Sequence, residues 1–538
     1  MKKASLAAAG MRLSLLTLAS RVLGLAREMT KAAFLGTSGY ADAFGIAFML
    51  PNLFRRLFAE NSISVAFIPT FKAYLEDAGT PEGVRAAREF AAAACTAVSF
   101  LSACVAVVGI LAAPAIVPLF FAGASSAGGA DAAAEAVLLT RLMFPYLCVI
   151  SVAAFFQGVL NALRIFAPSG FTPVLFNLAV IAATHLLSSF MANPARAMSV
   201  GVLLGGAAQA AFQLPFVVRS GWKPALTGLR AAFGNAGLRR VLKLVGPTVV
   251  GMAAYQLNDV VSTALAGKAG VGVVSSLQYS LRLQELILGI FAVSVGTVIL
   301  PDLSGLAKRG CWGEFNAMLV SAVKLLALVT LPATVFSLVA GDRLIVLLYK
   351  TRRFTDESVR LTHEAFRFHV AGLFFIAANR VLSPAFYARG DTASPTIAGL
   401  VGVVVNVALA CALVRPLSGG GIALALSLAS AANTVALAFF LVRRGCGTAR
   451  ALLPAAGYAV KVALCSFAAG VALLLAKPFL FAPFASFPRV VAEGVPLALS
   501  AALFAGITGG ALLLAKDPFL RSLFARLRRS AKPDDRVS

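Results

Sequence analysis

Charged residues are scarce in this chain of 538 residues. Only 13% of them are Asp, Glu, Lys or Arg, against about 25% in a typical soluble protein. So few charges cannot cover the surface of a water-soluble domain, and the 59% of hydrophobic residues excludes a disordered chain. The composition therefore predicts an all-α polytopic membrane protein with little mass outside the bilayer.

The signatures of metal, nucleotide and catalytic chemistry are also missing. The seven cysteines form no CxxC pair, the three histidines form no HExxH motif, and nothing matches a phosphate-binding P-loop. The sequence also has no convincing cluster of acids or histidines of the kind that a membrane-embedded glycosyltransferase or ligase would need. We therefore expect a transporter and no enzyme, without a resident cofactor or metal.

Positive charge is what the chain has in excess. It carries 47 Lys and Arg against 22 Asp and Glu, a net charge of +25, and most basic residues separate apolar runs. This pattern is typical of loops that face anionic membrane lipids on the cytoplasmic side. The basic tail lacks the aromatic residues that stack on bases, so no nucleic-acid partner is expected.

The apolar runs predict the topology. About fourteen of them reach the roughly 20 residues that a transmembrane helix needs. The basic loops fall on one side if both termini are cytoplasmic, which places the chain as a multi-pass protein of a cytoplasmic membrane. The loop 341–361 disagrees, because its five basic residues fall outside. Either it is a functional basic patch, which we favour, or the count of spans shifts there.

A weak internal repeat predicts two lobes. Residues 40–71 resemble residues 273–303 at a separation of about 230 residues, which is typical of duplicated transporters with a site near the midplane. Two six-helix lobes around a central cavity, followed by two further helices, would account for this. The predicted parts are an N-terminal lobe, a C-terminal lobe, a helical pair and a basic cytoplasmic tail: 1–218, 219–450, 451–515 and 516–538.

Charged residues inside the apolar runs are the candidate site, because each costs about 2.5–3.5 kcal/mol near the bilayer centre. In the first span, Arg21 and Glu28 share a helix face, and Ser20, Gly24 and Arg27 share the adjacent one. Gly24 leaves room for a kink or for a closely packed helix.

The second and eighth spans add to this group. Pro51 predicts a break in the second span, and in the eighth Arg282 and Glu285 lie on one side. The polar residues of the second span are Asp42, Asn52, Arg55, Arg56 and Glu60.

Two interpretations compete for these residues. In the first, the arginines are structural and pair internally, as Arg27 with Asp42 and Arg282 with Glu285, or extend to the interface. In the second, they line a wet cavity and bind an anion, since guanidinium groups stay charged and bind phosphate through two parallel hydrogen bonds. We favour the anion site, with one of Arg55 and Arg56 facing the cavity.

Several stretches together resemble the MurJ (MviN) family of bacterial lipid II flippases. They are SRVLGLARE at 20–28, ADAF at 41–44, LPNLFRRLFAE at 50–60, AFIPTF at 66–71 and YSLRLQELILGIFAVSVGTVILPDLS at 279–304. The resemblance implies the fold of the multidrug/oligosaccharidyl-lipid/polysaccharide exporters, with the last two helices forming a groove for a lipid tail. It also implies transport of the undecaprenyl-pyrophosphate-linked peptidoglycan precursor for cell wall synthesis, by alternating access in the inner membrane.

The resemblance also assigns roles to individual residues. Essential cavity arginines fall on Arg21, Arg27, Arg55 and Arg282, and the essential acid of the second helix falls on Asp42. Asn52, Glu60 and Glu285 match further family positions.

The energy source and the partners stay open. The family's sodium site would use Asp259 and Asn406, but Ala410 supplies no second acid, so Na⁺, H⁺ and the membrane potential remain alternatives. Lipid II and membrane lipids are the expected partners, together with the cell-wall synthesis machinery. A flippase for another polyprenyl-linked glycan and an ion-coupled drug exporter are the alternative functions.

Overall fold

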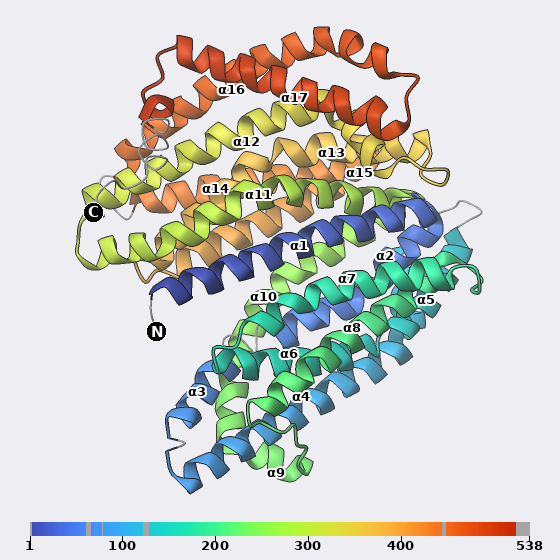
Figure 1. Cartoon of the computed structure of the whole chain (residues 1–538), viewed down its shortest axis with the longest axis vertical. Helices are drawn as coiled ribbons and strands as arrows, with labels where there is room; N and C mark the ends of the chain where they lie inside the picture. The colour runs from blue at the N-terminus through green and yellow to red at the C-terminus, as the bar shows by residue number, and fades with distance from the viewer. Residues whose placement is uncertain (1–2, 61–65, 78, 122–128, 444–447, 523–538) are drawn as a thin grey trace. The chain divides into compact units, whose positions relative to one another are not determined.

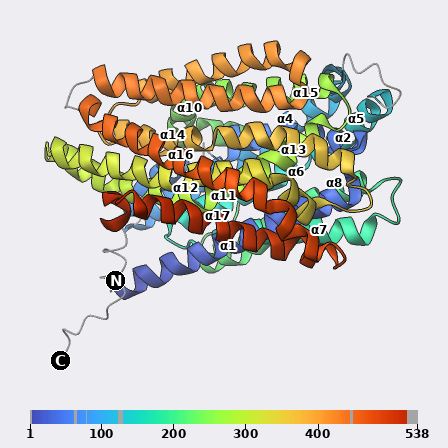
Figure 2. The same cartoon turned by 90° about the horizontal axis from the view of Figure 1, so that it is seen from above.

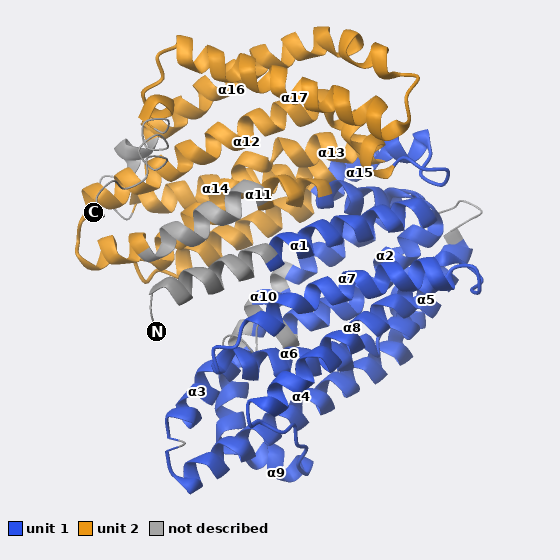
Figure 3. Cartoon of the chain, viewed as in Figure 1, with its two compact units in different colours: residues 1–282, 350–361, 410–422 blue, residues 283–349, 362–409, 423–538 orange. Residues whose placement is uncertain are grey.

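The computed structural model describes residues 3–60, 66–77, 79–121, 129–443 and 448–522. Every regular element in these ranges is a helix, as the composition predicts. The chain forms two compact units, which Figure 3 shows in different colours. Unit 1 comprises residues 1–282, 350–361 and 410–422, and unit 2 comprises 283–349, 362–409 and 423–538. The boundary therefore lies inside a helix at Arg282, and differs from the predicted division at residue 218.

Unit 1 consists mainly of the helices from α1 to the start of α11 (Figure 1). In chain order they are α1 (Lys3–Leu35), α2 (Gly39–Phe54), the π-helix η1 (Arg55–Glu60), α3 (Ile68–Glu76), α4 (Pro81–Ile116), the 3-10 helix η3 (Val117–Phe120), α5 (Gly129–Met143), α6 (Tyr146–Ala162), α7 (Ala167–Leu187), α8 (Pro194–Arg219), α9 (Leu229–Gly234), α10 (Ala236–Ala269) and the part of α11 (Val273–Lys308) up to Arg282.

Unit 2 contains the rest of α11 and the helices that follow. They are α12 (Trp312–Tyr349), most of α13 (Asp356–Ala371), α14 (Leu373–Tyr387), most of α15 (Ala393–Arg443), α16 (Thr448–Phe481), the 3-10 helix η4 (Ala482–Phe484) and α17 (Arg489–Leu514). α13 and α14 form a pair of helices bent by 43°, and α15 consists of two helices that meet at a kink at Ser418.

Small residues and aromatic rings form the packed interior of each unit. In unit 1, α7 and α8 lie side by side (Figures 1 and 2), and Gly201 of α8 comes so close to Val180 that a Cβ there would lie 2.9 Å from its Cα. Phe67, Phe71 and Phe90 stack together near one end of the unit. Glycine and alanine allow this close approach of helices, which is typical of membrane proteins.

The outer surfaces of several helices are apolar. Leu111 of α4, Leu475 of α16 and Leu514 of α17 are among the exposed large hydrophobic side chains. Eight helices of the described part are long and apolar enough to cross a membrane, and nine if α13 and α14 are one span. The helices that carry the arginines, α1 and α11, are not among these. The number fourteen therefore stays a prediction, while an integral membrane protein is what these helices show.

The equivalent turns in the predicted repeat are alike. After α6, Arg164 has a φ of 63° and the Ile165 N–H donates to the Leu160 carbonyl at 2.8 Å. After α14, Gly390 has a φ of 73° and the Asp391 N–H donates to the Phe386 carbonyl at 3.0 Å. Both helices thus end in the same left-handed turn. The similarity supports a duplication, although the residue with positive φ is an arginine after α6 and a glycine after α14.

Two lysines of α16 form ion pairs that hold the last two long helices, α16 and α17, within unit 2. Lys461 of α16 donates to Asp517, just beyond α17, at 2.8 Å, and Lys477 of α16 donates to Asp342 of α12 at 2.7 Å. Burial alone would raise the pKa of Asp517, but hydrogen bonds from Lys461 and from the Leu520 N–H hold its pKa below the ordinary value. The groove for a lipid tail that we predict on this pair stays a prediction.

Candidate functional site

Gly24 is the point where the arginine of α11 reaches α1. A Cβ atom at position 24 would lie 2.1 Å from an Nη atom of Arg282 and 3.8 Å from Nδ2 of Asn177. A larger residue would therefore displace the Arg282 guanidinium. This geometry agrees with the close approach that the sequence predicts for Gly24, and it places the eighth-span arginine against the first span.

Arg27 and Glu28 lie one turn further along α1. An Nη atom of Arg27 donates to Oε1 of Glu28 at 2.7 Å, and its guanidinium lies 5.7 Å from the centre of the Phe176 ring. Glu28 also interacts electrostatically with Arg282. Asn177 of α7 donates to the Ser20 carbonyl at 3.3 Å. We call Ser20, Gly24, Arg27, Glu28 and Arg282 the arginine cluster.

The arginine cluster is only partly covered. The side chains of Arg27 and Glu28 are 21% and 13% exposed, and Arg21, on the same helix, is also partly buried. The Arg27–Glu28 ion pair is therefore partly open to a polar ligand, and the Arg282 guanidinium lies against Gly24, one turn away. An arrangement of this kind suits an anion such as a phosphate.

A second group of arginines follows Pro51. α2 continues through this proline to Phe54 and then widens into the π-helix η1, so the irregularity that Pro51 predicts lies just after it. Arg55 donates through Nε to Oδ1 of Asn52 at 2.8 Å. The side chain of Glu60 lies outside the part of the chain whose side chains the structure describes.

Arg56 turns away from this group. It forms an exposed ion pair with Asp259 of α10 at 3.5 Å, whereas Arg55 is partly buried. The surroundings of the two neighbours differ, and the prediction that one of them faces a cavity stays a prediction. Asp259 belongs to unit 1, while Asn406 is buried in unit 2, so their use as an ion site stays a prediction. Glu285 is exposed on α11 beyond the boundary of unit 1.

Asp42 does not pair with Arg27, which pairs with Glu28 instead, so that predicted pair is wrong. Its side chain is buried and accepts the backbone N–H of Gly272 at 2.6 Å and that of Ser275 at 2.8 Å. These amides begin α11, where the helix dipole favours a negative charge. Gly272 has a φ of 85°, which only glycine adopts freely, and this turn directs its N–H at the carboxylate. Asp42 therefore positions α11.

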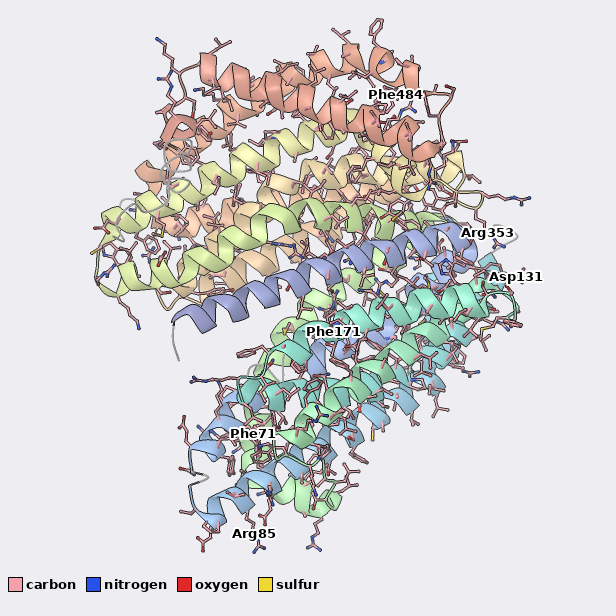
Figure 4. The ribbon with its side chains drawn as sticks, in the orientation of Figure 1. Phe71, Arg85, Asp131, Phe171, Arg353 and Phe484 are labelled. Carbon is pink, nitrogen blue, oxygen red and sulfur yellow. The ribbon has the colours of Figure 1, made fainter. Side chains whose placement is uncertain are left out.

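The same end of unit 1 is held by further bonds. The Tyr279 hydroxyl donates to the Gly36 carbonyl at 2.9 Å, and the hydroxyls of Thr37 and Ser358 lie 2.7 Å apart. Figure 4 shows Arg353 and Asp131 at this end and Phe71 and Arg85 at the other end of the unit. We call it the Gly36 end. Lys31, which sequence reasoning missed, is also buried here.

The basic residues of 341–361 are engaged in internal contacts. Most of the predicted loop is helical, and Arg343 binds Glu493 at 3.2 Å within unit 2. Lys350 and Arg360 pair with Asp356 and Glu357, and Arg353 donates to the Phe34 carbonyl. The contacts involve four of the five basic residues, all but Arg352, and the functional patch that we favour stays a prediction.

Comparison with known proteins decides the family. The sequence model described as "Lipid II flippase MurJ" matches residues 31–492. The chain belongs to the MurJ family. It is 46% identical over 530 residues to the probable lipid II flippase MurJ of Treponema pallidum, covering 98% of this chain and 99% of that one. It is 33% identical over 432 residues to the lipid II flippase MurJ of Burkholderia cenocepacia, covering 80% and 82%.

Solved structures of MurJ and of related exporters share the fold. A MurJ structure described as an inward closed conformation matches with a TM-score of 0.72 at 23% identity, over 92% of this chain and 98% of that one. An inward-facing multidrug exporter of the MATE family, of the MOP superfamily, matches with a TM-score of 0.64 at 16% identity, over 82% and 95%. The predicted transporter fold is therefore confirmed.

Proposed function

We propose that this MurJ-family chain moves lipid II, the undecaprenyl-pyrophosphate-linked peptidoglycan precursor, from the inner to the outer leaflet of a bacterial cytoplasmic membrane. The observation that carries the proposal is the arginine cluster, in which Arg27 forms an ion pair with Glu28 and the Arg282 guanidinium lies against Gly24, one turn away. The names of the family and of its relatives supply the substrate.

The physical task is to carry a charged headgroup through hydrocarbon. The polyprenyl tail can stay in the lipid, while the diphosphate needs cations that replace its water. Arginine suits this role because its planar guanidinium binds two phosphate oxygens at once. Arg27 and Arg282 would hold the diphosphate, with Arg21 and Arg55 extending the cationic surface.

We propose alternating access as the mechanism. The Gly36 end is the outer side in our assignment, with both termini cytoplasmic, and it is the end that must open for release. No covalent step is involved, so the residues bind, orient and release the headgroup. The energy would come from the membrane potential or an ion gradient, since one unit charge moved through 100 mV gains about 2.3 kcal/mol.

Lipid II export in a cell that depends on this chain tests the proposal. Arg282→Ala should lower the exposure of lipid II on the outer surface at least about tenfold and abolish growth, because one half of the guanidinium pair is lost. Arg85→Ala is the matched control, since Arg85 is a highly exposed arginine of the same unit. Normal export by both Arg282→Ala and Arg27→Ala would reject the site.

The same assay separates the alternative substrates. If depletion of the chain leaves lipid II exposure unchanged but blocks another polyprenyl-linked glycan or the efflux of a drug, the fold serves a different cargo. Cell-wall synthesis proteins as partners follow from the proposed substrate and would be sought by co-purification with the full chain.

A further inference from the structure

Lys31 is a buried cation that the anion site does not use. It lies on α1 beyond Arg27, near the Gly36 end, and is 3% exposed. Burying a lysine is costly unless its charge is balanced and its donors are used. The residue therefore needs a physical reason for its place.

Three contacts, one hydrogen bond and two with aromatic rings, hold the ammonium group. Its Nζ donates to Oε1 of Gln278 in α11 at 2.6 Å. It lies 4.9 Å from the centre of the Tyr279 ring and 5.8 Å from that of Phe44. Cations over aromatic faces are stabilised most where water is excluded. Two of these partners, Gln278 and Tyr279, belong to the first turns of α11.

The charge of Lys31 is balanced from both sides. It interacts electrostatically with Glu28 of the arginine cluster and with Asp42, the carboxylate that caps α11. Gln278 has no room to move aside freely, because a Cβ at Gly45 of α2 would lie 2.6 Å from its side-chain amide. Lys31 thus meets α11 at a point where α2 already confines the glutamine.

We infer that Lys31 is a positioning residue, which holds the start of α11 against α1 through Gln278 and so keeps the Gly36 end closed. The inference rests on the proposed function in assigning a role to opening at this end. Asp42 fixes the backbone of α11 one turn earlier, and Lys31 fixes the side-chain layer below it. Opening this end then requires the Lys31–Gln278 bond to break.

Closure can be measured by cross-linking Thr37→Cys to Ser358→Cys, whose native hydroxyls lie 2.7 Å apart. Trypsin would release these positions in peptides 32–55 and 354–360, or 28–55 and 354–360 where Lys31 is replaced. None of these peptides contains a native cysteine, so mass spectrometry can count the linked pair. The full-length protein is oxidised mildly in detergent, without substrate. The cross-linking rate then reports how often the Gly36 end is closed.

In this background, Lys31→Met and Gln278→Leu should each slow cross-linking by about tenfold, because each leaves a buried polar partner unsatisfied. The double variant should recover to within about twofold of the parent, because an apolar pair needs no hydrogen bond. Lys72→Met and Gln157→Leu, at exposed positions of unit 1, are the controls and should change nothing. A fall in overall stability alone would not be reversed by the second substitution.

Two results would overturn the inference. One is unchanged cross-linking in both single variants, and the other is a double variant slowed by the product of the single effects. If Lys31→Met does not fold, Lys31→Gln replaces it, because its shorter amide still donates, and its rate should fall less than that of Gln278→Leu. The cross-linking assay contains no lipid II, so a result that overturns the inference would not bear on the proposed transport. Conversely, a parent chain that exports no lipid II would not alter the cross-linking result.

Discussion

The Gly36 end and the arginine cluster are neighbouring polar regions of α1. They differ in how deeply their charged side chains are buried. At the Gly36 end, Lys31 and Asp42 are each 3% exposed and their charged atoms meet donors, acceptors and rings of the protein itself. In the arginine cluster, Arg27 is 21% exposed, and it and Arg282 both interact with Glu28. The first arrangement fixes a helix, and the second keeps charged side chains partly exposed.

The comparison explains why charge alone does not identify a site. Both regions contain buried or half-buried ions in an apolar helix. They differ in how far the protein covers the ions, which are buried at the Gly36 end and partly exposed in the arginine cluster. Substitutions at the Gly36 end should therefore change the conformation of the protein. Substitutions in the arginine cluster should change its affinity for lipid II.

Locking the Gly36 end should have the largest effect. Oxidised Thr37→Cys/Ser358→Cys should lose lipid II export by more than about tenfold, since a covalent link exceeds any hydrogen bond that opening must break. A reducing agent should restore export. Full export by the oxidised protein, with the link verified by mass, would show that this end need not open.

Removing the cap of α11 should cost stability. Asp42→Leu leaves two backbone amides without acceptors and should lower the free energy of unfolding by about 2–4 kcal/mol, seen as a lower thermal midpoint in detergent. Asp42→Asn keeps one acceptor oxygen and should lose about half as much. If Asp42→Leu is as stable as the parent, the cap is not what holds α11.

Adding one methyl group at Gly24 should alter affinity without altering stability. Gly24→Ala displaces the Arg282 guanidinium and should weaken binding of purified lipid II about three- to tenfold, because the guanidinium pair depends on its geometry. Gly506→Ala in α17, where a Cβ has nothing within 4 Å, is the matched control. Equal affinities of the two variants would contradict the assigned position of Arg282.

Ionic strength should have the smallest effect of these tests, and it should act differently on the two regions. Raising ionic strength from about 0.1 M to 0.5 M should weaken lipid II binding several-fold, because partly exposed charges are screened. The rate of cross-linking at the Gly36 end should change less than twofold, since its ions are buried. A larger change in closure than in binding would reverse the contrast between the regions.

Sequence reasoning predicted the class of the fold and much of the arginine cluster. Arginines in an apolar run are costly to place in a bilayer, so the sequence alone marks Arg27 and Arg282. Gly24 was found because a residue without a side chain between such arginines leaves room for a packed helix. Asp42 was also found as a charge in an apolar run, and the resemblance in the short stretches added its essential role. Helix periodicity placed Arg21 and Glu28 on one face. It could not show which carboxylate would form an ion pair with Arg27.

Long-range partners could not be predicted. Asp42 meets backbone amides some 230 residues away, and no side-chain pattern marks a backbone donor. Lys31 was missed because a lysine between Arg27 and the helix end resembles an interfacial residue that extends to water. Its position on α1 near the arginines was the signal available. The unit boundary at Arg282 also follows from packing, which apolar runs do not reveal.

Direct binding of lipid II to the purified chain tests the central claim most directly. The parent and Arg85→Ala should bind with equal affinity, and Arg27→Ala/Arg282→Ala should bind at least about a hundredfold more weakly, as expected when two charge-assisted contacts to a diphosphate are lost. Equal affinity of the double variant and the parent, with both proteins folded, would contradict the claim that these guanidinium groups hold the headgroup.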